Sequence, residues 1–160
     1  TNATIQGLEL AFKSSVSDST EIEGALELIK GKDTKKSRTL PLMPANNLKL
    51  SLHQSLPNLM LAHKQRLSVN YKYVDSQNVG GSYEPFFQYN TLPFGSANTP
   101  SYQLWGLEYA TTLDVLEKKP RFNIRVTNLF DTKYRDFLDT YKGYALAMGR
   151  DISFNLRIPF

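Results

Sequence analysis

The feature that most constrains this chain is a strict alternation of apolar and polar residues. In the last stretch every second residue is apolar, namely Ile152, Phe154, Leu156, Ile158 and Phe160. Six further stretches alternate in the same way, at residues 7–13, 21–28, 48–53, 66–73, 105–111 and 122–127. Because successive side chains of a strand point to opposite faces, each stretch predicts a strand with one apolar and one polar face. We therefore expect an all-β fold, an antiparallel up-and-down meander of about seven strands.

The predicted connections between these strands alternate in length. Short or intermediate connections are expected near residues 17–19, 56–65 and 116–120, and long loops at 31–46, 75–101 and 130–149. Successive connections of an antiparallel meander lie at opposite ends of the sheet, so the long loops would gather at one end. Outer-membrane β-barrels have this arrangement, with short turns on one side of the membrane and long loops on the other.

Charged residues lie opposite the apolar residues in most of the predicted strands. They are Glu9, Lys13, Glu21, Glu23, Glu27, Lys49, Arg66, Lys72, Glu108, Arg125 and Arg157. In a soluble β-sandwich or small ligand-binding barrel this charged face would meet water and the apolar face would form the core. In a membrane barrel, a receptor or a passive porin, the apolar face would meet lipid and the charged face a wet lumen. The alternation leaves these alternatives open, and the sorting of the loops favours the membrane barrel.

Composition excludes several other classes of protein. The chain has 160 residues, a formal net charge of +4 and no cysteine, so disulfide scaffolds, thiolate metal sites and cysteine nucleophiles are absent. Its densest basic cluster, Lys35, Lys36 and Arg38, is too sparse to indicate a nucleic-acid partner. The apolar runs are a few residues long, whereas a membrane-spanning helix needs about 20.

No group of residues in the sequence predicts catalysis, a metal site or a cofactor. Glu21, Glu23 and Glu27 share one face of a predicted strand, but no neighbour distinguishes one acid from another, and a solvated wall is the simpler interpretation. His53 and His63 lack the surrounding ligand pattern of a metal site. We therefore expect a protein that is not an enzyme and that carries no cofactor.

Two sequences near the C-terminus resemble motifs of a known family. Residues 149–160 read GRDISFNLRIPF, a glycine-arginine pair followed by an alternating strand and a terminal aromatic residue. Residues 126–134 read VTNLFDTKY. Residues 149–160 resemble the closing strand of TonB-dependent outer-membrane receptors. Residues 126–134 resemble the penultimate strand and the last outer loop of the same receptors. Further motifs at residues 7–10, 40–44 and 100–102 follow in the order of that family, so the resemblance covers nearly the whole chain.

The resemblance implies that residues 1–160 are the C-terminal segment of a 22-stranded outer-membrane β-barrel, with the plug domain absent from this sequence. It implies contact with outer-membrane lipid and insertion by the barrel-assembly machinery, with Ile158 and Phe160 in the assembly signal. It also implies import of a scarce nutrient (a siderophore, haem, a metal chelate, cobalamin or a glycan), powered by the TonB system through the plug. Seven strands alone are expected not to close into a barrel, and the isolated chain is expected to aggregate.

Candidate ligand-binding residues lie in two predicted outer loops. The loop at 75–101 places aromatic side chains among polar residues, namely Tyr83, Phe86, Phe87, Tyr89 and Phe94. Such side chains can bind an apolar or planar ligand, and they can also pack the loop on itself or lie at the membrane interface. The last loop contributes Tyr134 and Arg135, a pair common in the family, with either a structural or a ligand-binding role.

Overall fold

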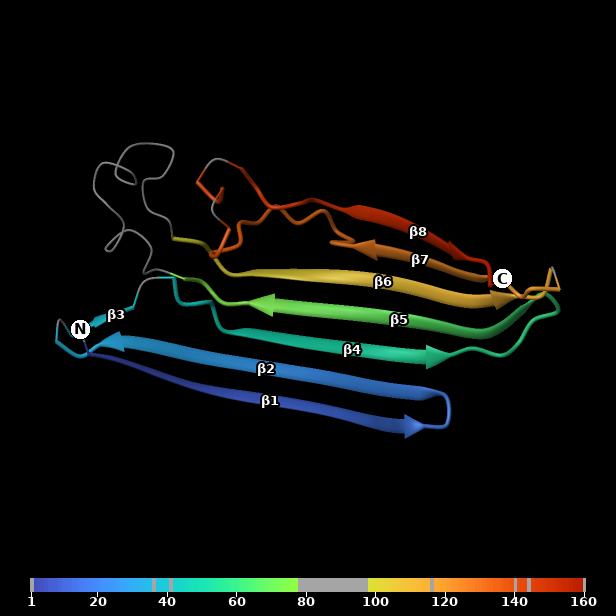
Figure 1. Cartoon of the computed structure of the whole chain (residues 1–160), viewed down its shortest axis with the longest axis horizontal. Helices are drawn as coiled ribbons and strands as arrows, with labels where there is room; N and C mark the ends of the chain where they lie inside the picture. Colours follow the sequence, from blue (N-terminus) through green and yellow to red (C-terminus); the bar gives the residue numbers. More distant parts are fainter. Residues whose placement is uncertain are drawn as a thin grey trace.

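The chain forms a single antiparallel β-sheet, shown in Figure 1, in a computed structural model that describes residues 2–35, 37–40, 42–77, 98–115, 117–139, 141–143 and 145–159. Its strands are β1 (Ala3–Ser17), β2 (Thr20–Asp33), β3 (Arg38–Thr39), β4 (Asn47–Ser55), β5 (Ala62–Val74), β6 (Tyr102–Leu113), β7 (Arg121–Thr127) and β8 (Asp151–Arg157). The seven long strands lie in the order β1-β2-β4-β5-β6-β7-β8. The predicted meander is therefore confirmed. Among the described residues, none belongs to a helix long and apolar enough to cross a membrane.

Most strands extend beyond the stretches predicted from the sequence, whereas the last strand is shorter at its C-terminal end and one short strand was not predicted. The last strand was expected to continue through residue 160, but β8 ends at Arg157, and Ile158 and Pro159 lie beyond it. Pro159 has no N–H group to donate to a neighbouring strand, which fits an end to the ladder here. The short strand β3 was not predicted, because two residues cannot show an alternation; it pairs with Lys32 and Asp33 of β2.

The register of the strands gives the sheet one apolar and one polar face. Directly opposed residues share a face of the sheet. One row of opposed residues crosses six strands and is apolar throughout, namely Ile22, Leu52, Val69, Leu107, Val126 and Ile152. The adjacent row is polar throughout, namely Glu21, His53, Ser68, Glu108, Arg125 and Ser153. The alternation seen along each strand is thus aligned across the whole sheet.

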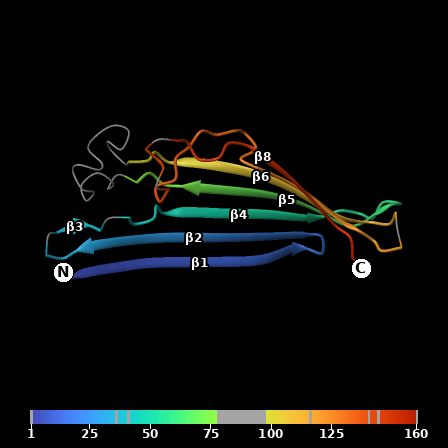
Figure 2. The same cartoon turned by 45° about the horizontal axis from the view of Figure 1, so that its top comes forward.

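The sheet is a single layer, as Figures 1 and 2 show from two directions. Large apolar side chains of the outer strands are exposed, for example Leu10 at 54% and Phe154 at 68%. The buried apolar side chains of the described residues, Met43, Val74, Tyr102 and Phe137, lie at or beyond the strand ends that carry the long loops. A β-sandwich would instead bury the apolar face against a second sheet. The described residues contain no such second sheet.

The connections are sorted by length between the two ends of the sheet (Figure 1). The β1–β2, β4–β5 and β6–β7 connections lie at one end, which we call the turn end, and occupy residues 18–19, 56–61 and 114–120. The β2–β4, β5–β6 and β7–β8 connections lie at the other end, the loop end, and run over residues 34–46, 75–101 and 128–150. The β2–β4 connection includes the short strand β3. This confirms the predicted arrangement.

Candidate functional site

The structure places only part of the predicted ligand-binding set. Tyr83, Phe86, Phe87, Tyr89 and Phe94 lie outside the described residues, as does Phe160 of the predicted assembly signal. Tyr134 and Arg135 lie in the β7–β8 connection at the loop end, and Ile158 follows β8 at the turn end. Tyr134 and Arg135 therefore lie at the opposite end of the sheet from Ile158.

Tyr134 packs its loop against β6. Its ring lies against the ring of Tyr102, with 4.4 Å between the ring centroids, and the Tyr102 hydroxyl donates a hydrogen bond of 3.2 Å to Asp136 Oδ2. Burial, and secondarily the charge of Asp136, raise the pKa of the Tyr134 hydroxyl above its usual range. Arg135 is exposed. These contacts give Tyr134 a role in packing the loop, and ligand binding by the pair stays a prediction.

The residues of the NLFD sequence shape the start of this loop. Asn128 is 5% exposed and has a φ of 49°, and its side chain both accepts a 2.8 Å hydrogen bond from Thr132 N and donates a 2.9 Å bond to Thr132 O. Asp131 Oδ1 accepts a 2.8 Å hydrogen bond from Arg150 N. A Cβ atom on Gly149 would lie 2.6 Å from the same oxygen, so a larger residue there would have to displace the Asp131 carboxylate. The sequence resemblance thus rests partly on residues with a structural role.

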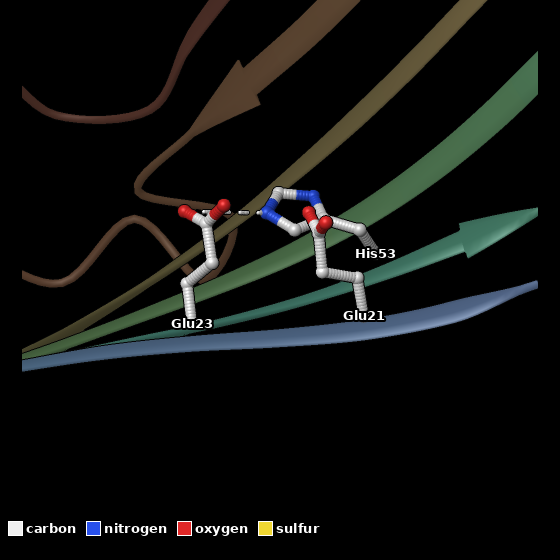
Figure 3. A group of neighbouring side chains, drawn as sticks. All are labelled: Glu21, Glu23 and His53. Atoms are coloured by element: carbon white, nitrogen blue, oxygen red, sulfur yellow. Dashed lines mark ion pairs between the residues drawn. The ribbon is translucent and has the colours of Figure 1, made fainter. Parts of the chain in front are cut away.

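The polar face carries the densest group of interacting charges in the described residues, centred on β2 (Figure 3). Lys13 Nζ of β1 lies 3.0 Å from a Glu21 carboxylate oxygen and 2.7 Å from one of Glu23. Arg66 of β5 reaches Glu21 at 2.9 Å, and His53 Nε2 of β4 lies 3.8 Å from Glu23. Four neighbouring strands therefore contribute to one network. The sequence did not reveal this network, because the register between the strands decides which of these residues meet.

Two further groups extend the pairing of charges across the polar face. Glu27 accepts hydrogen bonds from Lys49 at 2.8 Å and from Asn47 at 2.9 Å. Glu108 of β6 accepts bonds from Arg125 Nε at 2.9 Å and from Asn123 at 2.6 Å, both on β7. Each of these acids is satisfied by cross-strand neighbours, so these pairs neutralise charge along the face while the side chains of Lys49 and Arg125 stay about half exposed.

Glu21, Glu23 and His53 also have the geometry of a set of metal ligands. One ligand atom from each residue lies within 4.8 Å of the others, and Figure 3 shows all three side chains pointing from β2 and β4 to the same side of the sheet. Carboxylate and imidazole groups are suitable ligands for several divalent metals. However, Lys13 and Arg66 already neutralise the two carboxylates, so a metal ion would have to displace at least Lys13. The network is therefore best described as ion-paired side chains on a hydrated wall.

Comparison with known proteins gives one informative result. No family model and no curated protein matches the sequence. Among solved structures, the chain is similar to one described as "Copper transporter OprC", with a TM-score of 0.78 and 18% sequence identity. The match covers 99% of this chain and 24% of that chain, so the 160 residues span about a quarter of the length of OprC. At 18% identity this similarity shows a shared fold. The meander described above is similar to part of that transporter.

Proposed function

We propose that this chain forms part of the wall of an outer-membrane receptor barrel that imports a scarce nutrient with energy from the TonB system. The observation that carries the proposal is the continuous apolar face, which no other layer of the described residues covers. In water, each exposed large apolar side chain forgoes about 1.5–3 kcal/mol of favourable burial. Lipid on this face would remove that cost, while the ion-paired polar face would line a wet lumen.

The free edges of the sheet support a larger barrel. Within the described residues, β1 and β8 each pair with one neighbour only, so each leaves one edge of its backbone unpaired. In a membrane, unpaired N–H and C=O groups are costly, and closed barrels avoid them. We therefore infer that further strands of the same barrel pair with β1 and β8. The match to 24% of OprC is consistent with this inference.

The nature of the cargo rests on two kinds of likeness. The name of OprC states that it transports copper, and this supports a transport role and keeps a metal or metal chelate among the candidate cargoes. The sequence resemblance to TonB-dependent receptors supports energised import, and it leaves siderophores, haem, cobalamin and glycans as further candidates. Residues of the loop end, including Tyr134 and Arg135, remain the predicted contacts with the nutrient.

Fractionation of the producing cells tests the location. Peptides of this chain are expected in purified outer membranes, in a species several times heavier than the 18.2 kDa of these 160 residues. Recovery in a water-soluble fraction, at the mass of the chain alone, would contradict the proposal and favour a soluble ligand-binding β-protein.

Uptake assays test the mechanism. Cells with and without the gene, each with and without TonB, are offered iron chelates, copper, haem, cobalamin and oligosaccharides in turn. We expect uptake of one of these compounds to require both the gene and TonB. Uptake that requires the gene but continues without TonB would instead identify a passive porin.

A further inference from the structure

A group of five basic residues lies at the turn end of the polar face. These residues, which we call the turn-end basic cluster, are Lys64, Lys118, Lys119, Arg121 and Arg157. Together with Thr112 and Pro159 they line one hollow of the surface, and no acidic residue takes part in the lining. A chain with a formal net charge of only +4 thus concentrates five cations around a single hollow.

The cluster is assembled from segments far apart in the sequence. Lys64 lies at an irregularity near the start of β5, where the register shifts between His63 and Arg66. Lys118 and Lys119 belong to the β6–β7 turn. Arg121 begins β7 and lies directly opposite Arg157 at the end of β8. The hollow is therefore a product of the fold.

Elsewhere on the polar face, four of the five lysines and arginines of the long strands are paired with acids, and Lys72 is the exception. Lys13, Lys49, Arg66 and Arg125 all contact glutamates at 3.0 Å or less. By contrast, no member of the cluster forms an ion pair with any described residue. Like charges directly opposite each other on neighbouring strands are destabilising, and Arg121 and Arg157 are such a pair. The surplus of positive charge is thus local and uncompensated.

Neighbouring acids do not supply the missing negative charge. Asp114 and Glu117 lie in the same β6–β7 turn, but neither lines the hollow. The Asp114 carboxylate instead lies 3.5 Å from His63 Nε2. The described residues therefore leave the positive charge of the cluster without a carboxylate partner.

The backbone at two members of the cluster is held in an unusual conformation. Lys64 has a φ of 51° and Lys119 a φ of 45°, in the left-handed region that favours glycine. Such a conformation costs about 1–3 kcal/mol for a residue with a side chain, and ligand-binding sites are among the places where it recurs. Both residues line the hollow, one in β5 and one in the β6–β7 turn.

We propose that the turn-end basic cluster binds a small, multiply charged phosphate anion from solution. Arginine guanidinium groups match phosphate oxygens in pairs, and lysine ammonium groups add point charges around them. Arg121 lies directly opposite Thr112 and Arg157. It is on the same face of β7 as Asn123 and Arg125, so the cluster lies on the polar face. This choice of source rests on the proposed function: if the apolar face meets lipid, a dissolved phosphate compound reaches the polar face more readily than a lipid headgroup does.

Calorimetric titration with inorganic pyrophosphate tests the proposal, using the complete protein that carries this chain, purified in detergent. We expect saturable binding, weakened about tenfold or more by Arg157→Gln, since each lost charge-assisted contact is worth about a factor of ten. Arg125→Gln is the matched control, because it removes one positive charge from the same face but from an arginine already paired with Glu108. It should change the affinity less than twofold. The heat-dependent gel mobility of both variants verifies that the barrel is folded.

Three results would overturn the proposal. The first is no pyrophosphate binding by the folded protein. The second is equal weakening by Arg157→Gln and Arg125→Gln, which would show unspecific attraction to the charged face. The third would come from a binding measurement in nanodiscs, in which Arg157→Gln weakens association with phosphatidylglycerol but does not change the affinity for pyrophosphate. The phosphate group that the cluster binds would then belong to a lipid headgroup.

Discussion

At the scale of single residues, the polar face is stabilised by pairs that the register brings together. Glu108 accepts hydrogen bonds from Arg125 and Asn123, and its replacement by glutamine leaves the arginine without a charged partner. Because the Arg125 side chain is about half exposed, at 53%, we expect Glu108→Gln to lower the free energy of unfolding by only about 0.2–1 kcal/mol. Denaturant titration of the complete protein in lipid vesicles measures this change.

Glu9 provides the matched comparison for Glu108. It lies opposite Glu27 in the β1–β2 pair and has no ion pair among the described residues. Glu9→Gln therefore removes a repulsion, and the free energy of unfolding should stay the same or rise slightly. Equal destabilisation by Glu9→Gln and Glu108→Gln would contradict the assigned pairing.

Gly24 leaves room for the aromatic ring of a residue on the neighbouring strand. It lies opposite Phe12, and a Cβ atom at this position would come within 2.2 Å of the Phe12 ring. We expect Gly24→Val to displace the ring and lower the free energy of unfolding by about 1 kcal/mol. The same substitution in a Phe12→Ala background should cost less, because the clash is then absent. Additive effects in this double-mutant cycle would show that ring and glycine are independent.

At the scale of elements, the alternation predicted all seven long strands and their meander. It worked because the middle of each long strand has one largely apolar side, as in 152–156, so that period two stands out along the sequence. It did not predict strand ends. Alternation fades near the turns, so β2 and β5 extend beyond the stretches expected.

The candidate sites were predicted much less well than the strands. The contact of Lys13 with Glu21 and Glu23 depends on the register between β1 and β2, which a strand pattern alone leaves open. The same holds for Arg121 and Arg157, which are 36 positions apart in sequence and directly opposite in the sheet. One signal in the sequence could have indicated that Arg121 and Arg157 meet. Each is a basic residue at the turn end of its predicted strand.

The two faces of β8 should respond differently to charge. Phe154 lies on the apolar face opposite Ile124, and the next residue, Asn155, lies on the polar face opposite Asn123. If the apolar face meets lipid, Phe154→Arg should lower the free energy of unfolding in vesicles by about 2–4 kcal/mol. Asn155→Arg adds the same group to the lumen side and should cost under about 1 kcal/mol. Equal costs for the two variants would contradict a lipid-facing assignment.

At the scale of the whole molecule, the 160 residues alone expose what a complete barrel would cover. The apolar face lacks a covering layer, and β1 and β8 each have a free edge within the described residues. We therefore expect the isolated chain to self-associate in buffer without detergent, as exposed edges and apolar patches favour. Sedimentation velocity measures this directly. A single species of 18.2 kDa, monomeric and folded, would count against the membrane-wall interpretation.

The order of the strands has a mechanical consequence. Along the seven long strands, neighbours in space are neighbours in sequence, once the two-residue β3 is set aside. Each hairpin can therefore form or separate without a distant segment, because the contacts that it breaks are its own and those to the next strand along the chain. If the sheet lies in a bilayer, as we propose, a force applied to one end would extract it hairpin by hairpin, in a succession of small steps.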